Sequence, residues 1–474
     1  MKRNVLTAIV LAAAVVALAA YLASGVRVLD DPEDLRAFYC AGETVAAHRD
    51  PYLTEPLRAC EVREARAAGL TPYARLALPA PLPGFAFAPL ALVARLPFAT
   101  VSALWVLLLP AALALTALLV HKLADVPVSG IVAALVLGDG WISLANGHIV
   151  PFAVLALCAS AFEIARDRPV RASIYALLAS IEPHVALPAC LALAVAAPKT
   201  RLPLAAGAAL LAAVSLVTIG PGANLEYVLR VLPAHAHSEL AAARQFSLTT
   251  LLYRSGVSAQ PAILLGNVSY ALLCVLGIVV ARRLARSLAA PELLVLVPPA
   301  FAVFGGPFVH LTQVAVAIPA LVVLMVRLPA HRTALGIALL LVALPWEDLS
   351  ENATVAMLVF IGVFSLAIAL LVWRASPRVA LVAMAGMLAI GGLERTAVIT
   401  LERPPGDATA ALAAVDTSGS QLAETTWAAF VAASQDEDER LYLVTHLPTW
   451  FGLGLAIAAT ANAARSRAQA RESR

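Results

Sequence analysis

The chain has 474 residues, of which 61% are hydrophobic and only 13% are charged, and its formal net charge is +3. This charged share is about half that of an ordinary soluble domain, so most of the chain has too few charged residues to form a surface in contact with water. The composition excludes a soluble globular protein and predicts an integral membrane protein.

Apolar runs of about 20 residues recur along the whole sequence, and each is long enough to cross a hydrocarbon core as a helix. Because these runs are long and lack period-two alternation, they exclude a β-barrel and predict an all-α fold. We predict a polytopic transmembrane helical bundle with about 12–14 spanning helices. The expected spans are residues 4–26, 98–121, 127–145, 149–165, 171–182, 184–198, 202–219, 262–281, 291–306, 311–328, 333–346, 353–373, 378–400 and 447–464.

Basic residues fall in alternate loops between these spans, beginning with Lys2 and Arg3 before the first one. The positive-inside rule therefore predicts that both termini are cytoplasmic. We expect the first span to be retained, because its apolar run is longer than the core of a usual signal peptide. Three polar segments are then expected outside, at about residues 27–97, 220–261 and 401–446.

The cysteines do not follow a metal-binding pattern. Cys40 and Cys60 share the first outer segment, where they either form a disulfide in an oxidising compartment or stay free, and sequence spacing leaves both open. The run from His235 through His237 to Glu239 has residue types that bind metals, but a solvated loop is the interpretation we favour. No metal and no other cofactor is expected.

A short surface helix is predicted near residues 35–47. It should end before Asp50-Pro51, because a residue that precedes proline favours an extended backbone conformation. The stretch Asp34-Leu35-Arg36-Ala37-Phe38-Tyr39-Cys40-Ala41-Gly42, followed by Asp50-Pro51-Tyr52, carries a family resemblance. It resembles the first outer loop of the family 87 glycosyltransferases, which are polyprenyl-phosphate-mannose-dependent mannosyltransferases of the GT-C superfamily.

The resemblance extends over about residues 1–330 in order and spacing. Its further motifs are Phe85-Ala86-Phe87-Ala88-Pro89-Leu90, Leu96-Pro97, Leu104-Trp105 and Gly306-Pro307-Phe308-Val309-His310. Two places depart from the family pattern, since His148 stands where the family often has glutamine and Glu182 where it often has lysine. These departures leave the sugar and the acceptor open.

The resemblance implies a GT-C catalytic core over residues 1–346, including the outer loop 27–97. Residues 347–474 would add C-terminal spans, the outer loop 401–446 and a basic cytoplasmic tail. Asp34 matches the family carboxylate that acts as base on an acceptor hydroxyl. The alternative interpretations are that Asp34 is only an acid in the first turn of a helix, or that Asp30 or Asp31 is the base.

His310 matches the family histidine, and the resemblance implies that it holds the donor phosphate. A single histidine at a helix end is also often a structural hydrogen-bond donor. Arg244, in the second outer segment, is a second candidate for the phosphate. Glu182 lies between two short apolar segments, where an acid is expensive to hold, and it is a cavity-lining candidate with His148 and Tyr39.

The expected protein is an inverting glycosyltransferase that moves a sugar, with mannose as the first choice, from a polyprenyl-phosphate donor to a lipid or glycan acceptor. Its expected place is a bacterial plasma membrane, with the active site facing the periplasm or the exterior. Membrane lipids are expected partners and nucleic acid is not. The alternative is a secondary transporter or lipid flippase, against which the absence of paired halves and the long first outer loop both argue.

Overall fold

A computed structural model describes residues 32–344, Trp346, Ile368 and residues 407–415, 421–434 and 439–472. Within these ranges the chain is helical, and its extended pairing is limited to the isolated bridges Leu53 to Leu422 and Gln245 to His310. The all-α prediction is therefore confirmed for this part of the chain. The spans expected at 4–26, 353–373 and 378–400 lie outside the described residues, apart from Ile368.

Four helical stretches among the described residues are long and apolar enough to cross a membrane: α5 (Phe98–Ala124), Pro198–Ser238 containing α11 (Arg201–Glu226), α14 (Ala259–Leu288), and most of α24 (Glu439–Glu472). A fifth candidate is the pair formed by Leu311–Arg327 and Pro329–Ala343, which is bent by 115°. This pair contains α16 (Leu311–Val314), α17 (Ala317–Arg327), η5 (Pro329–His331) and α18 (Arg332–Ala343).

The other predicted spans in the described ranges form helices shorter than a membrane is thick. They are α6 (Val128–Leu135), α8 (Val150–Ala165), α9 (Pro169–Leu178), α10 (Pro183–Ala196) and α15 (Leu293–Ala302). The prediction of about 12–14 full spans is therefore not met in the part of the chain described, where four or five pass the test of length and composition. Short helices persist at membrane depth because neighbouring helices bury their ends and satisfy their backbone groups.

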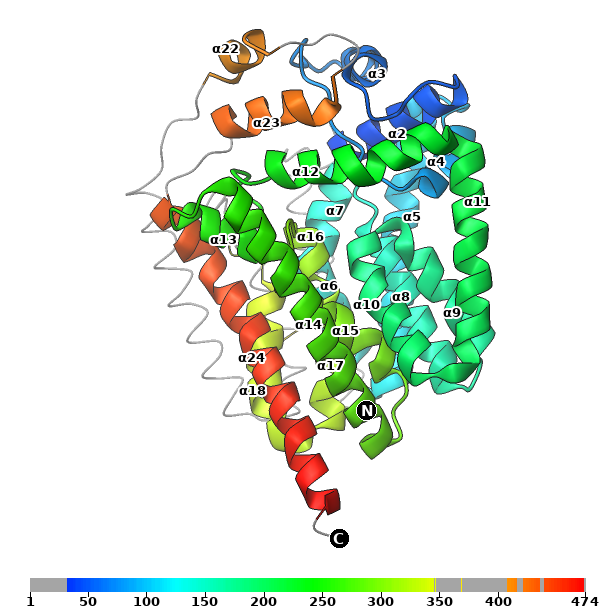
Figure 1. Ribbon diagram of the computed structural model, residues 1–474, viewed down its shortest axis with the longest axis vertical. Helices are drawn as coiled ribbons and strands as arrows, with labels where there is room; N and C mark the ends of the chain where they lie inside the picture. Colours follow the sequence, from blue (N-terminus) through cyan, green and yellow to red (C-terminus); the bar gives the residue numbers. More distant parts are fainter. Residues whose placement is uncertain are drawn as a thin grey trace.

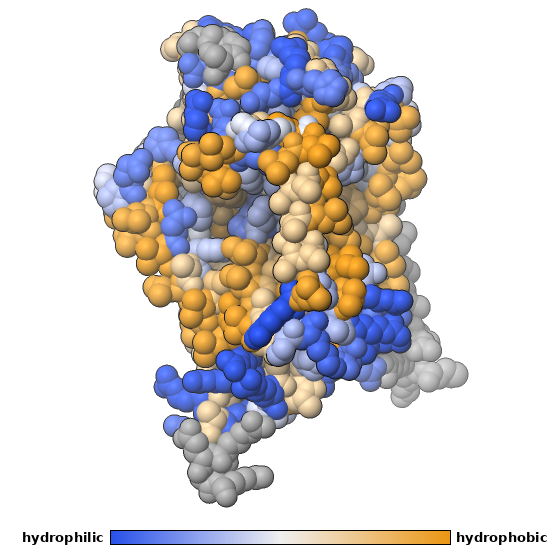
Figure 2. All heavy atoms as spheres, turned by 45° about the vertical axis from the view of Figure 1, so that its right-hand side comes forward, coloured by the Kyte–Doolittle hydropathy of each residue, from blue (hydrophilic) through white to orange (hydrophobic). Residues whose placement is uncertain are grey.

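The long helices expose large apolar side chains to their surroundings. Leu202 and Val217 of α11 are 79% and 88% exposed, and Leu107 of α5 is 69% exposed. Figure 2 shows these surfaces as an apolar band between two polar ends. Such a band would be unfavourable in water, so it is the surface that faces lipid.

Short helices form a layer across one end of the bundle (Figure 1). They are α2 (Glu33–Ala46), α3 (Thr54–Ala67), α4 (Gly84–Val93), α12 (Leu232–Ser238), α22 (Ala408–Ala413) and α23 (Ala423–Ser434). The chain turns from α11 into this layer at Gly220, whose φ of 78° favours glycine. α13 (Leu248–Arg254) then leads from the layer into α14.

The layer joins parts of the chain that are far apart in sequence. The Thr54 amide donates to Gln421 O at 2.8 Å, and the Ala423 amide donates to Tyr52 O at 3.0 Å. α23 also packs on α12, and α24 packs on α18. The described parts on either side of residue 346 therefore pack as one body.

The predicted basic turns meet at the opposite end of the molecule. Lys122 and Arg166 both lie against the Phe162 ring, and Lys199 pairs with Asp167 at 3.1 Å. α14 and α24 also run to that end, where their last turns carry arginines (Figure 1). The polar layer and the basic turns thus lie at opposite ends of the apolar band.

Candidate functional site

A cavity of about 1220 Å³ lies beneath the polar layer. Its polar part is lined by residues of α2, α12, α23 and the segments between helices near residues 148, 182, 244 and 310. Its apolar wall comes from α9, α10, α11 and α14, which also face lipid. The cavity therefore joins a polar chamber to an apolar wall within the membrane band.

Asp34 lies in the first turn of α2 and lines the chamber. Burial, reinforced by the negative charges of Glu33 and Glu239, raises the pKa of the Asp34 carboxyl to about 8, against the opposing effect of Arg244. Asp34 is partly exposed and lines the cavity. Asp34 can thus change between acid and base near neutral pH.

Close packing of Gly147 brings the turn before α8 against α2. Gly147 has a φ of 75°, and a Cβ atom there would come within 2.5 Å of the Leu35 Cβ. Trp105 Nε1 donates to the Gly147 carbonyl at 2.9 Å. This packing places His148 at the cavity wall, edge-on to the Phe38 ring.

The helix break predicted before His310 is present. α15 ends at Ala302, and Gly306 has a φ of 118° in the segment that follows. The Phe246 amide donates to Val309 O at 2.7 Å, which holds this segment beside residue 245. His310 then enters the cavity at the start of α16.

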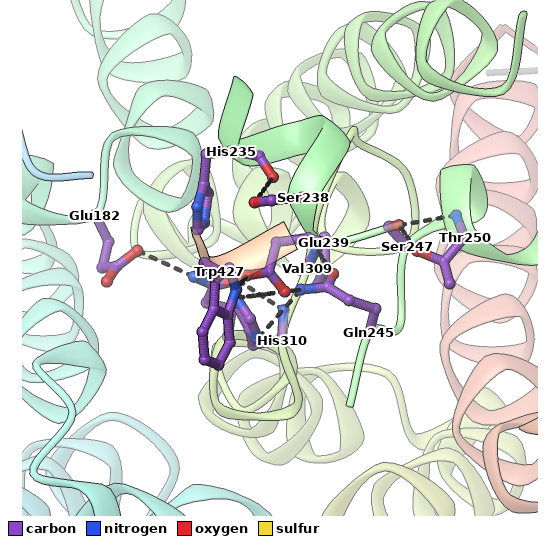
Figure 3. Close-up of polar contacts among 11 residues, drawn as sticks. Glu182, His235, Ser238, Glu239, Gln245, Ser247, Thr250, Val309, His310 and Trp427 are labelled. Carbon is purple, nitrogen blue, oxygen red and sulfur yellow. Dashed lines mark hydrogen bonds and ion pairs between the residues drawn. The ribbon is translucent and has the colours of Figure 1, made fainter. Parts of the chain in front are cut away.

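Gln245 joins His310 to a buried carboxylate (Figure 3). Its Oε1 accepts from the Val309 amide at 2.8 Å, so its amide nitrogen faces the other way. That nitrogen lies 3.1 Å from both ring nitrogens of His310 and donates to Glu239 Oε2 at 3.0 Å. The Trp427 indole donates to the other oxygen of Glu239 at 2.5 Å.

Glu182 lies at the break between η2 (Ala179–Ile181) and α10, as expected from its position between short apolar segments. Gln313 Nε2 donates to Glu182 Oε2 at 3.2 Å, and His184 Nδ1 lies 3.8 Å from the same oxygen. The Gln313 side-chain oxygen accepts from the His310 amide at 2.8 Å. Glu182 is therefore connected to the His310 segment through Gln313.

The structure brings five of the six sequence candidates to one cavity: Asp34, His148, Glu182, Arg244 and His310. Tyr39 is the exception, because it is absent from the lining of this cavity. Its hydroxyl donates to Leu96 O at 3.0 Å and its ring packs on Phe98, so the expected cavity-lining role is replaced by a contact between α2 and the start of α5.

Sequence reasoning did not single out Gln245, Gln313 or Trp427. The two glutamines lie beside candidate residues in sequence, but nothing in the local pattern marks them. Trp427 lies 188 residues from its partner Glu239, and no periodicity connects the two. Their roles depend on contacts that only the folded chain makes.

The first and second helices of the polar layer are joined by a disulfide between Cys40 and Cys60, whose Cα atoms are 5.6 Å apart. The pairing that the sequence left open is thus present in the structure.

The chamber combines a carboxylate that titrates near neutral pH, several imidazoles and a guanidinium with an adjoining apolar wall. Such groups can transfer a proton and stabilise an anion next to a lipid chain. No protein-family model, curated protein or solved structure matches this chain.

Proposed function

We propose that the protein is a membrane-embedded inverting glycosyltransferase of the GT-C type, similar to family 87. It would transfer a sugar, with mannose as the first choice, from a polyprenyl phosphate to a lipid or glycan acceptor. One observation carries the proposal: the carboxylate, the anion-binding groups and a lipid-facing apolar wall share a single cavity.

The apolar wall suits the lipid part of the donor. Leu211 and Leu216 of α11, Leu187 of α10 and Ile263 of α14 line it. Leu187 and Leu216 are also exposed at the surface of the bundle, so the wall continues into the apolar band. A polyprenyl chain would lie there without leaving the hydrocarbon, while its phosphate reached the polar chamber.

The reaction follows from the polar groups. The Asp34 carboxylate takes the proton of an acceptor hydroxyl, and the oxygen attacks the anomeric carbon of the sugar. The bond from that carbon to the phosphate oxygen breaks, and the phosphate leaves with the electron pair. Arg244 and His310 stabilise the leaving phosphate, and a single displacement inverts the anomeric configuration.

We propose further that the polar layer is outside the cytoplasm and that both termini are inside. The basic turns at the opposite end support this orientation through the positive-inside rule, and the Cys40–Cys60 disulfide supports it through redox compartment. An active site that faces a bacterial periplasm or exterior is part of the same proposal.

Cysteine labelling tests this orientation. Single cysteines at the exposed positions Ala68 and Ala410 should react with an impermeant maleimide in intact cells, whereas one at Thr333 should react only after permeabilisation. The background should lack Cys158, Cys190 and Cys274 and keep the disulfide pair. The reverse pattern of labelling would place the cavity on the cytoplasmic side and contradict the proposal.

Transfer itself is tested with the purified full-length protein in lipid nanodiscs. Polyprenyl-phosphate-[³H]mannose should be consumed in the presence of a lipid extract from the host membrane, with radioactivity passing to a new product. The Asp34→Asn variant should bind the donor but not consume it. Donor movement across proteoliposomes without bond cleavage would instead support the transporter alternative, and absence of donor binding would overturn both the donor and the site.

A further inference from the structure

Three potential metal ligands from separate segments converge at the wall of the cavity. They are His235 of α12, Glu239 just after this helix, and His310 at the start of α16. One ligand atom from each residue lies within 4.8 Å of the other two. Figure 3 shows the three side chains directed toward a common region beneath α12.

The buried Glu239 carboxylate receives its side-chain hydrogen bonds from neutral groups, which favours binding of a cation beside it. The residue is 2% exposed, and the side-chain donors that reach its oxygens in the described ranges are the neutral groups of Trp427 and Gln245. His310 Nε2 lies 3.8 Å from Glu239 Oε2. A buried carboxylate normally has a charged partner or a metal ion, because neutral hydrogen bonds replace only part of its hydration.

His235 supplies a second, independent observation. It is 5% exposed, and its Nδ1 atom has no hydrogen-bond partner among the described residues. Its ring packs edge-on against Phe308, which holds it beside His310. A buried ring nitrogen without a partner is costly unless a ligand uses its lone pair.

We propose that His235, Glu239 and His310 bind a divalent transition-metal ion of the zinc class. Two imidazoles and one carboxylate are a ligand set that Zn²⁺ accepts, and three protein ligands leave at least one coordination position open. Because all three residues line the cavity, the open position faces its contents. This proposal departs from the expectation of no metal that was made from the sequence.

Gln245 and Trp427 fit the role of supporting groups for such a site. Gln245 is held by the Val309 amide and already contacts both Glu239 and His310, while Trp427 fixes the other carboxylate oxygen. Metal binding at one His310 nitrogen would leave an N–H at the other, which cannot bond to the amide nitrogen of Gln245. The His310 ring would therefore turn away from Gln245, and Gln245 would keep its hydrogen bond to Glu239. Outer hydrogen bonds of this kind orient metal ligands and tune their basicity.

The role of the bound metal, although not its binding, rests on the proposed function. At the open position the ion would bind an oxygen of the donor phosphate, and its charge would stabilise the leaving group. Metal binding itself needs no donor, so it can be measured whether or not the protein transfers sugar.

The test is a titration of the untagged full-length protein in detergent after removal of bound metal with a chelator. Zn²⁺ should bind at one equivalent per chain, as measured by elemental analysis and by competition with a chromophoric chelator. Co²⁺ should bind at the same site and give visible absorption bands of a four- or five-coordinate ion with nitrogen and oxygen ligands.

Variants then assign the ligands. His235→Ala and Glu239→Gln should each weaken Zn²⁺ binding at least tenfold and abolish the Co²⁺ bands. His237→Ala is the matched control, because His237 lies on the same helix, is exposed and is not in the cluster, so Zn²⁺ affinity should be unchanged. Zn²⁺ should also raise the Tm of the parent protein and of His237→Ala but not of Glu239→Gln.

Two outcomes would overturn the proposal. One is failure of Zn²⁺ and Co²⁺ to bind stoichiometrically to the parent protein, and the other is an equal loss of binding in His237→Ala and His235→Ala. If Zn²⁺ does not bind while Asp34-dependent transfer persists, the metal site is wrong and the transferase stands. If Zn²⁺ binds with the predicted ligands but no donor is bound or cleaved, the metal site stands and the proposed function is wrong.

Discussion

Replacement of Asp34 by asparagine should lower sugar transfer at least about a hundredfold, the low end for losing a general base. Asparagine keeps the size of the side chain and a hydrogen bond but removes the proton acceptor. Donor binding should be retained, because the phosphate contacts are assigned to Arg244 and His310. Steady-state transfer and a separate donor-binding assay in nanodiscs measure the two effects.

The pH dependence of the parent enzyme provides an independent measurement on the same residue. The pKa of Asp34 is about 8, and only the ionised form accepts a proton, so kcat/KM should rise with pH and level off above about pH 8. Arg244 lowers this pKa, so Arg244→Gln should move the rising limb to higher pH. If Asp34→Asn transferred sugar at nearly the rate of the parent enzyme, Asp30 or Asp31 would be assigned as the base instead.

Replacement of His310 by alanine should lower kcat/KM about a hundredfold or more, which is the usual cost of one preorganised donor at a developing anion. The hydrogen bond from the His310 amide to the Gln313 side chain does not need the imidazole, but the contact of the His310 side chain with the backbone of the first turn of α16 is lost in this variant. Transfer kinetics and the Tm of the detergent-solubilised variant separate a loss of chemistry from a loss of folding.

Comparison with Arg244→Gln separates the two proposed roles of His310, contact with the donor phosphate and binding of the metal. Both variants should weaken transfer, but only His310→Ala should also weaken Zn²⁺ binding, because Arg244 is not a metal ligand. Parental transfer by His310→Ala would make His310 a structural residue at a helix end. The phosphate site would then be sought at Arg244, His235 or His237.

Several features of this protein were predictable from local sequence. Long apolar runs indicated a membrane protein, because a helix in the hydrocarbon core needs predominantly apolar side chains along its whole length. The short helix beginning near Asp34 and the break between the predicted spans 291–306 and 311–328 were also expected from local patterns of polar residues, glycine and proline. These signals depend on near neighbours in the chain, so one sequence is sufficient to find them.

Other features were decided only by tertiary structure. Hydropathy does not distinguish a full span from a short helix buried by its neighbours, and this is why α9, α10 and α15 were predicted to be spans. Tyr39 and Asp34 lie on the same short helix, yet only Asp34 lines the cavity, because α2 turns its other face toward α5.

The convergence of His235, Glu239 and His310 is also a property of the folded chain. It depends on the turn at Gly220, which directs α12 across the bundle, and on the pairing of residue 245 with the His310 segment. The contact of Trp427 with Glu239 adds a segment from the far end of the sequence. Local sequence supplied residue types suited to bind an anion or a metal, whereas long-range packing decided which of them meet.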